Sequence, residues 1–269
     1  MDDYIKQLAE ELKQQLQDKM SKYDTDVVKS QQYQQELKYL SDFSLDAIQT
    51  IKNISFCSTR AKDIYDQFLT IKSSDDLIQS IVGLRDLLIN GIHNMAKREV
   101  RYMLEMTVKY LVVDQEKMGE QLSVKTQHLA DNIPNSSIEV IDRLSTPFDT
   151  ITDKQFKDEV KDMFYKACAY VHPSKRQIDE QVDNYSKGIH IGFETAKTLA
   201  DINKLLFRGY DIILTMLFIG FGQSLSGDLF IEIYDTEPKW KFHKGKYLKE
   251  YSKLFDYKAE RQKKQPLTR

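Results

Sequence analysis

Glycine and proline are scarce in this sequence. Its 269 residues include only 10 Gly and 5 Pro, and long stretches rich in Leu, Lys, Gln, Asp, Glu and Ile run without interruption. Sheets need frequent turns, which these two residues mark most strongly. We therefore predict an all-α protein, long enough for one large domain or two small ones.

Cysteine and long apolar runs are also scarce. The two cysteines, Cys57 and Cys168, lie far apart, and no signal peptide is recognisable, so we expect a cytoplasmic protein with free thiols. The most apolar run, residues 212–222, is about half of the roughly 20 residues needed to cross a bilayer. We predict that it forms a buried core helix and that the chain has no membrane span. A further alternative is that this run perturbs membranes on activation.

The usual signatures of metal and cofactor sites are missing. The sequence has no His-x3-His pair with a carboxylate, no CxxC, no Gly-rich phosphate loop and no nucleophile elbow. We therefore expect neither a metal nor a cofactor. Four of the five histidines show no such spacing: His93, His128, His190 and His243.

Positive charge gathers at the C-terminal end of the chain. The formal net charge is −2, but residues 239–269 hold eleven Lys/Arg against three Asp/Glu, an excess of +8, so the preceding residues carry −10. Aromatic residues alternate with these lysines, as in single-stranded RNA sites. Rings at helical spacing are more often core, so we expect them to dock and the end, residues 261–269, to be disordered. The rings are Trp240, Phe242, Tyr247, Tyr251 and Phe255.

The chain divides into three predicted segments. Residues 1–74 form a helical extension, in which an apolar row recurs every four residues. Residues 75–222 form the main helical bundle, interrupted by a linker-like stretch at residues 131–153 that holds two prolines. Residues 223–269 form the basic aromatic segment. The apolar row consists of Tyr4, Leu8, Leu12, Leu16 and Met20.

A charged stripe occupies one helical face within residues 98–114. Arg98, Arg101, Glu105 and Lys109 recur at helical spacing beside an apolar stripe. A Glu105–Lys109 pair at i,i+4 contributes about 0.2–0.5 kcal/mol on an exposed helix. One interpretation is a solvated, salt-bridged face. Apolar segments on both sides favour partial burial instead, and buried charge must be paired or used.

A histidine stands before a proline in the segment FYKACAYVHPSK, residues 164–175. The residue before proline disfavours the α conformation, so we predict that a helix beginning near Lys154 ends near His172. A histidine at this end of a helix is favoured in its protonated form and can act as general acid or base near neutral pH. The alternative is a structural imidazole that satisfies the last carbonyls of the helix.

The two stretches together resemble the HEPN superfamily, in particular its abortive-infection and phage-defence branch. RYMLEMTVKYL is followed some sixty residues later by YKACAYVHPS, and the resemblance covers about residues 75–222. It implies a helical bundle that forms a homodimer and, in active members, a metal-independent endoribonuclease. The matching positions are Arg101, Glu105, Tyr170, His172, Pro173 and Ser174.

The resemblance also implies roles for particular residues. His172 would be the general acid or base, with Arg101 or Lys166 stabilising phosphate charge and Glu105 orienting a cation. Lys166 stands where the family has arginine, and lysine cannot bind phosphate bidentately. Residues expected to contact the RNA are Tyr170, Ser174, Lys175 and Lys109.

Two functions follow from the resemblance. The first is an RNA-cleaving protein of phage defence or a toxin–antitoxin pair, which a partner protein or a trigger must restrain. The second is a catalytically inactive helical module that dimerises or binds another protein.

Overall fold

The computed structural model describes residues 2–135, 137–172, 174–186 and 195–264. These residues contain helices and no strand, so the all-α prediction is confirmed. The α-helices are α1 (Asp2–Tyr23), α2 (Gln31–Ser58), α3 (Lys62–Tyr65), α4 (Leu69–Lys72), α5 (Ser74–Ile89), α6 (His93–Glu116), α7 (Leu122–Asn132), α8 (Thr150–Cys168), α9 (Lys175–Ser186), α10 (Ala196–Phe221), α11 (Gln223–Glu232), α12 (Lys246–Lys253) and α13 (Ala259–Lys264). Short turns of other helix types are η1 (Asp24–Val28), η2 (Thr59–Ala61), η3 (Glu139–Arg143), η4 (Tyr234–Thr236) and η5 (Lys241–Lys244).

Local sequence signals set the ends of the long helices. Ser30, Asp149 and Thr195 precede α2, α8 and α10, and their side-chain oxygens accept hydrogen bonds from backbone N–H groups of the first turn. Such caps satisfy donors that have no partner within the helix. At the other end of α10, Gly222 has φ 82°, a backbone conformation that residues with a Cβ avoid, and it terminates the helix.

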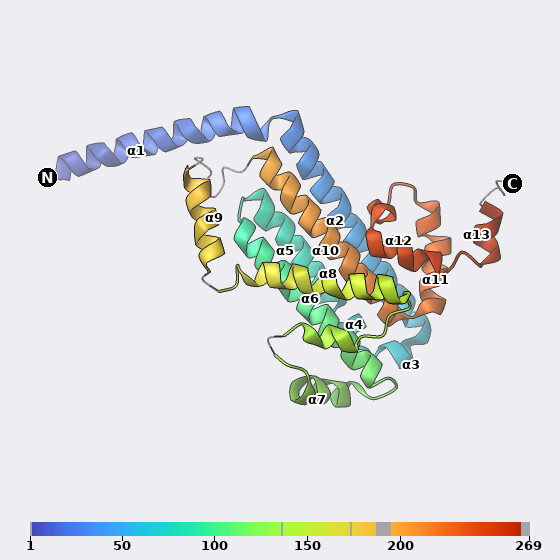
Figure 1. Cartoon of the computed structure of the whole chain (residues 1–269). Helices are drawn as coiled ribbons and strands as arrows, with labels where there is room; N and C mark the ends of the chain where they lie inside the picture. Colours follow the sequence, from blue (N-terminus) through green and yellow to red (C-terminus); the bar gives the residue numbers. More distant parts are fainter. Residues whose placement is uncertain (1, 136, 173, 187–194, 265–269) are drawn as a thin grey trace.

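Helix α10 lies in the middle of the molecule. It packs against α2, α6 and α12, while α5 contacts α2 and α6, and α8 crosses α6 (Figure 1). The apolar run 212–222 falls in the last part of α10 and is mostly buried, which confirms the predicted core helix. Within the described residues, no helix combines the length and the apolar character that a bilayer span requires.

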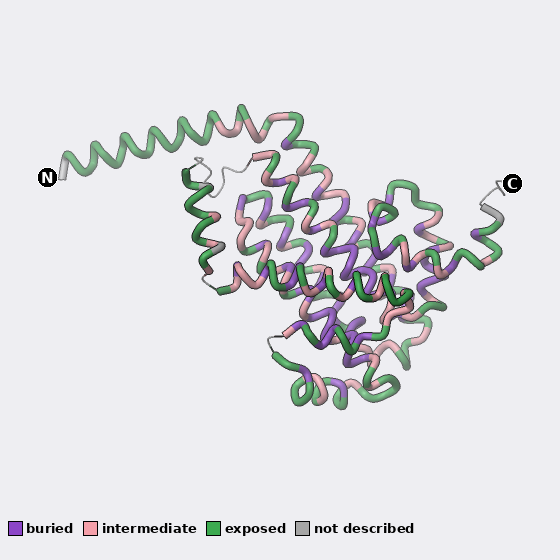
Figure 2. The backbone as a smooth tube through the Cα atoms, in the orientation of Figure 1, coloured by how far each residue is buried: buried purple, intermediate pink, exposed green. Residues whose placement is uncertain are grey.

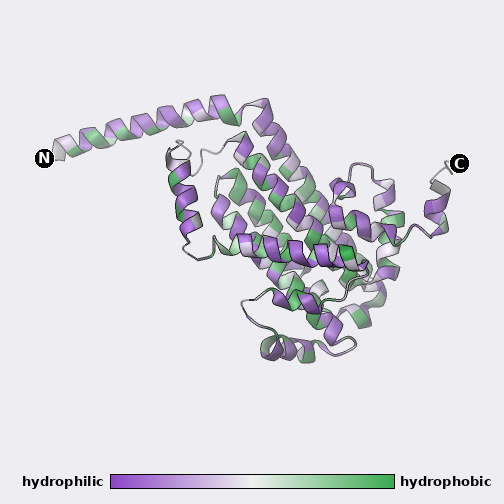
Figure 3. Ribbon diagram, viewed as in Figure 1, coloured by the Kyte–Doolittle hydropathy of each residue, from purple (hydrophilic) through white to green (hydrophobic). Residues whose placement is uncertain are grey.

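The hydrophobic core draws on all three predicted segments. Its buried side chains run from Tyr33 in α2 to Phe255 after α12. Helix α1 extends away from this core, and every residue from Tyr4 to Lys22 is exposed (Figure 2). Apolar residues recur among polar ones along α1 (Figure 3). Because these residues are exposed, the predicted apolar row faces solvent.

The stretch 131–153 is not a linker. It contains η3, and Ile138, Ile141 and Leu144 are buried against the core, with η3 packed on α6. The prolines and polar residues of this stretch suggested a loop, but the apolar residues between them outweigh that signal because they can be buried on α6.

The aromatic residues of the C-terminal segment dock onto the bundle, as expected. The five rings from Trp240 to Phe255 are all buried, so they cannot stack on bases. In α13, Arg261 is buried and ion-paired with Asp235 and Asp256, so the disorder expected from residue 261 does not include it. Residues 265–269 lie outside the described residues.

Candidate functional site

The charged stripe of α6 is a paired, partly buried cluster rather than a solvated face. Glu105 lies between two cations: its Oε2 is 3.2 Å from Nη2 of Arg101, and its Oε1 is 2.5 Å from Nζ of Lys109. The side chains of Arg101, Glu105 and Lys109 are only 19%, 15% and 11% exposed. Lys109 also donates to the carbonyl of Asn135 at 2.8 Å. We call these three side chains the α6 cluster.

Arg101 connects the two sequence motifs. Its Nε donates to Sγ of Cys168 at 3.2 Å, and its guanidinium carbon lies 4.8 Å from the ring centroid of Phe164. Both partners belong to α8. The helix crossing of α6 and α8 therefore brings the Arg-x3-Glu segment against the segment that leads to His172.

Helix α8 ends earlier than we predicted. Its last residue is Cys168, and hydrogen bonds from Tyr170 N to Ala167 O and from Val171 N to Cys168 O continue the chain as a turn. His172 therefore lies beyond the helix and does not share its face with Cys168. The helix starts at Thr150 rather than near Lys154 because Asp149 caps it.

His172 is exposed and makes no hydrogen bond or ion pair with any residue that the structure describes. The carbonyls after the helix have other partners: Ser174 Oγ donates to Ala169 O at 2.7 Å, and Arg98 Nε donates to Tyr170 O. The structural role that we considered for the imidazole is therefore filled by a serine and an arginine.

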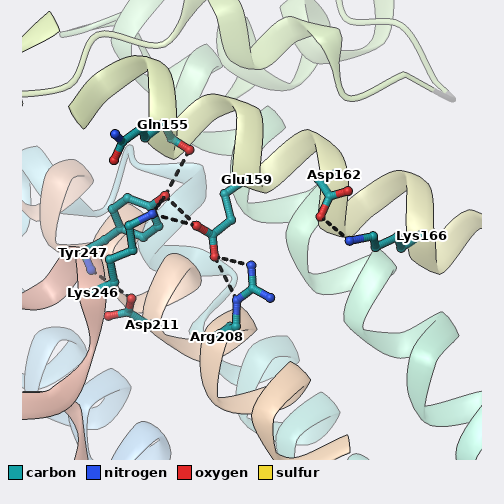
Figure 4. Close-up of polar contacts among 8 residues, drawn as sticks. All are labelled: Gln155, Glu159, Asp162, Lys166, Arg208, Asp211, Lys246 and Tyr247. Atoms are coloured by element: carbon teal, nitrogen blue, oxygen red, sulfur yellow. Dashed lines mark hydrogen bonds and ion pairs between the residues drawn. The ribbon is translucent and has the colours of Figure 1, made fainter. Parts of the chain in front are cut away.

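The other predicted site residues take different environments. Ser174 directly precedes α9, and its Oγ accepts a hydrogen bond from Gln177 N at 3.1 Å. Lys175 is exposed and pairs with Asp179 at 2.6 Å. Lys166 pairs with Asp162 at 2.7 Å on α8, and both side chains are about half exposed (Figure 4). Pro173 lies outside the described residues.

A cavity of about 1450 Å³ opens between the start of α6, the end of α8, α9 and the start of α10. Two predicted site residues, Lys166 and Tyr170, line it, whereas Arg101, Glu105 and Lys109 do not. Tyr170 is buried: its hydroxyl donates to Glu180 at 2.5 Å, and Nζ of Lys97 lies 4.0 Å from its ring centroid. The structure thus separates the predicted residues into the α6 cluster, the cavity wall, the exposed His172, and Ser174 and Lys175 at the start of α9.

His93 also lines the cavity, although its spacing in the sequence gave no indication of a role. Burial, aided by the nearby charge of Lys97, lowers the pKa of its imidazole to about 4, so it is neutral at physiological pH. Its Nε2 is enclosed and has no hydrogen-bond partner among the described residues.

A second ionic cluster was not apparent from the sequence. The carboxylate of Glu159 on α8 lies 2.6 Å from Arg208 of α10, 3.0 Å from Lys246 of α12 and 2.8 Å from the hydroxyl of Tyr247 (Figure 4). Burial tends to raise the pKa of Glu159, but hydrogen bonds from these three groups outweigh it and hold the pKa below its usual range. We call these four side chains the Glu159 cluster.

Next to the Glu159 cluster, Asp211 holds the start of α12. Its buried carboxylate accepts from the backbone N–H groups of Tyr247 and Leu248 at 2.9 and 3.1 Å. Burial raises the pKa of Asp211 to about 6 in spite of these bonds. Gly245 is required beside it, because a Cβ there would lie 2.2 Å from Oδ1 of Asp211.

No arrangement of three or more His, Cys, Asp and Glu side chains within the described part of the chain could hold a metal ion. Comparison with protein-family models, curated proteins and solved structures finds no match to the chain. The resemblance to the HEPN superfamily therefore stays a prediction, which rests on the two sequence segments around Arg101 and His172.

Proposed function

We propose that this chain is a HEPN-like, metal-independent endoribonuclease that acts in phage defence or as the toxin of a toxin–antitoxin pair. His172 is its general acid or base, at the cleft of a homodimer. The observation that supports this best is the state of His172: it is exposed and has no partner among the described residues. An imidazole in that state can exchange protons with a substrate.

In this proposal, the α6 cluster supplies positive charge close to the catalytic segment. Glu105 fixes Arg101 by an ion pair, and Cys168 and Phe164 hold the same guanidinium against α8. Arg101 thus orients α8 and adds positive charge near the segment before His172. Lys166, paired with the half-exposed Asp162, can exchange that partner for an RNA phosphate. A partner protein or a trigger restrains the activity.

The second candidate function is an inactive interaction module of the same systems. The pairing of Arg101 favours it, because a guanidinium that already serves Glu105, Cys168 and Phe164 is less available to stabilise a transition state. In this alternative the α6 cluster is purely structural and the exposed His172 has no chemical task.

The test compares the wild type with His172→Ala on total RNA and on tRNA, each with and without EDTA. The first function predicts EDTA-resistant cleavage that the substitution abolishes. A matched control is His243→Ala, since His243 is also exposed but lies in the C-terminal segment, and cleavage should persist. If wild type and His172→Ala are equally inactive and any toxicity is unchanged, the ribonuclease proposal fails and the interaction module stands.

A further inference from the structure

The cavity between α6, α8, α9 and α10 combines an apolar wall with charged groups. The buried side chains of Val100, Met163 and Ile202 form part of its lining. Gln177 and Gln181 on α9 also line it. Ligand sites are typically of this kind, mostly apolar with a few polar groups that fix orientation.

The charged residues of the lining carry a positive surplus. Lysine and arginine contribute four side chains, against two carboxylates. Lys97 is already paired with Glu180 at 2.8 Å, and Lys166 with Asp162. The neutral His93 adds no charge. The lining cations are Lys97, Arg98, Lys166 and Lys197, and the carboxylates are Glu180 and Asp201.

Two of these cations are available to an incoming anion. Arg98 uses Nε to bond the carbonyl of Tyr170, and its Nη groups have no hydrogen-bond partner among the described residues. Lys197 is exposed and has no ion pair within the same part of the chain. Arg98 lies on α6 and Lys197 on α10, so the two cations line the cavity from different helices. A guanidinium together with an ammonium is a usual arrangement for binding phosphate.

We propose that this cavity binds a nucleoside phosphate. The phosphate lies on Arg98 and Lys197, and the base packs against the apolar wall of Val100, Met163 and Ile202. An aliphatic anion would use the apolar wall and the cations but would make no hydrogen bond to the two glutamine amides. A base offers donors and acceptors that match such amides. The ligand is either a free nucleotide or one nucleotide of an RNA strand.

The first experiment measures binding of AMP and UMP to the full chain by titration calorimetry, with adenosine and inorganic phosphate as partial ligands. We expect at least one nucleotide to bind, and each partial ligand to bind at least about tenfold more weakly, because each lacks half of the interactions. Absence of binding by both nucleotides and by RNA, or equal binding of phosphate and nucleotide, would overturn the proposal.

A pair of charge reversals, one in the cavity lining and one outside it, tests the location. Lys197→Glu should lower nucleotide affinity at least about tenfold, because a charge-assisted bond is replaced by repulsion. Lys52→Glu is the control: Lys52 is exposed on α2, has no ion pair among the described residues and does not belong to the lining. It should leave the affinity within about twofold. An equal loss in both variants would show a general charge effect and contradict the proposed site.

A third set of measurements separates the two sources of the ligand and the two proposals. A single-stranded hexanucleotide that binds while free AMP and UMP do not assigns the cavity to RNA. Competition by the free nucleotides assigns it to a small ligand. His172→Ala should not change nucleotide affinity, since His172 does not line the cavity. Loss of cleavage with retained binding, or binding without any cleavage, therefore distinguishes this site from the proposed ribonuclease activity.

Discussion

The α6 cluster and the Glu159 cluster each join one glutamate to an arginine and a lysine, and the second adds a tyrosine, but they are assembled differently. In the α6 cluster, Arg101, Glu105 and Lys109 follow each other at four-residue spacing on one helix. In the Glu159 cluster, the carboxylate meets Arg208 and Tyr247, which are 49 and 88 residues away in sequence. The first is visible in the sequence as a stripe, whereas the second exists only because α8, α10 and α12 meet.

The two clusters also differ in exposure, and in a way that spacing does not indicate. The cations of the α6 cluster are mostly buried, whereas Arg208 and Lys246 are about half exposed. A surface i,i+4 pair contributes little to stability. Removing one partner of a buried pair costs more, because it leaves the other charge buried and uncompensated. The cluster with the simpler sequence pattern is therefore expected to matter more for stability.

The largest effect is expected from Glu105→Ala. It leaves Arg101 and Lys109 partly buried without their shared carboxylate, and we expect a loss of about 3 kcal/mol in the free energy of unfolding. Urea denaturation measures it. Glu105→Gln keeps an acceptor and should lose less. A loss below about 0.5 kcal/mol would mean that the pairs behave as solvated surface bridges and would reverse the comparison.

The next largest effect is the pH dependence of stability that Asp211, beside the Glu159 cluster, produces. Its pKa is raised from 3.8 to about 6, so the folded state binds this proton more tightly than the unfolded state does. This group therefore lowers stability as pH rises from about 4 to about 6, by about 2–3 kcal/mol at one unit per 1.36 kcal/mol.

Asp211→Asn removes this titration. The stability of the wild type minus that of the variant should fall with pH across the same interval, as thermal unfolding in a buffer series would record. A difference that is constant from pH 4 to pH 7 would contradict the assignment, whatever its absolute size.

A smaller effect is expected from Glu159→Gln, about 1–2 kcal/mol. The substitution weakens charge-assisted bonds to Arg208, Lys246 and Tyr247, but the two cations can regain water. Combining it with Tyr247→Phe tests whether the cluster acts as a unit. A double-mutant cycle should give a coupling of about 1 kcal/mol, and additive losses would mean that Tyr247 depends on its other acceptor, the carbonyl of Gln155.

The smallest effect is expected from Lys166→Ala, which removes an exposed i,i+4 pair with Asp162 on the same helix as Glu159. Stability should change by less than about 0.5 kcal/mol. A larger loss in chemical denaturation would show that the cavity depends on Lys166 for its structure, and would weaken its role as a residue that exchanges partners.

The sequence by itself determined the helical class, the core position of residues 212–222 and the Glu105–Lys109 pair of the α6 cluster. All three follow from local rules: few turn residues, a continuous apolar run and four-residue spacing on one helix. The same rules failed at the end of α8, because the hydrogen bonds that shape this turn involve Arg98 of α6 and Ser174, which lies between α8 and α9.

Only the tertiary structure decided the rest. It buried the stretch 131–153 against α6, joined Glu159 to α10 and α12, and formed a cavity from the ends of α6, α8 and α10 with α9. Each depends on contacts between residues that are distant in the chain. Periodicity shows which face of a helix is apolar, but not which helix covers that face or where the ends of several helices leave space.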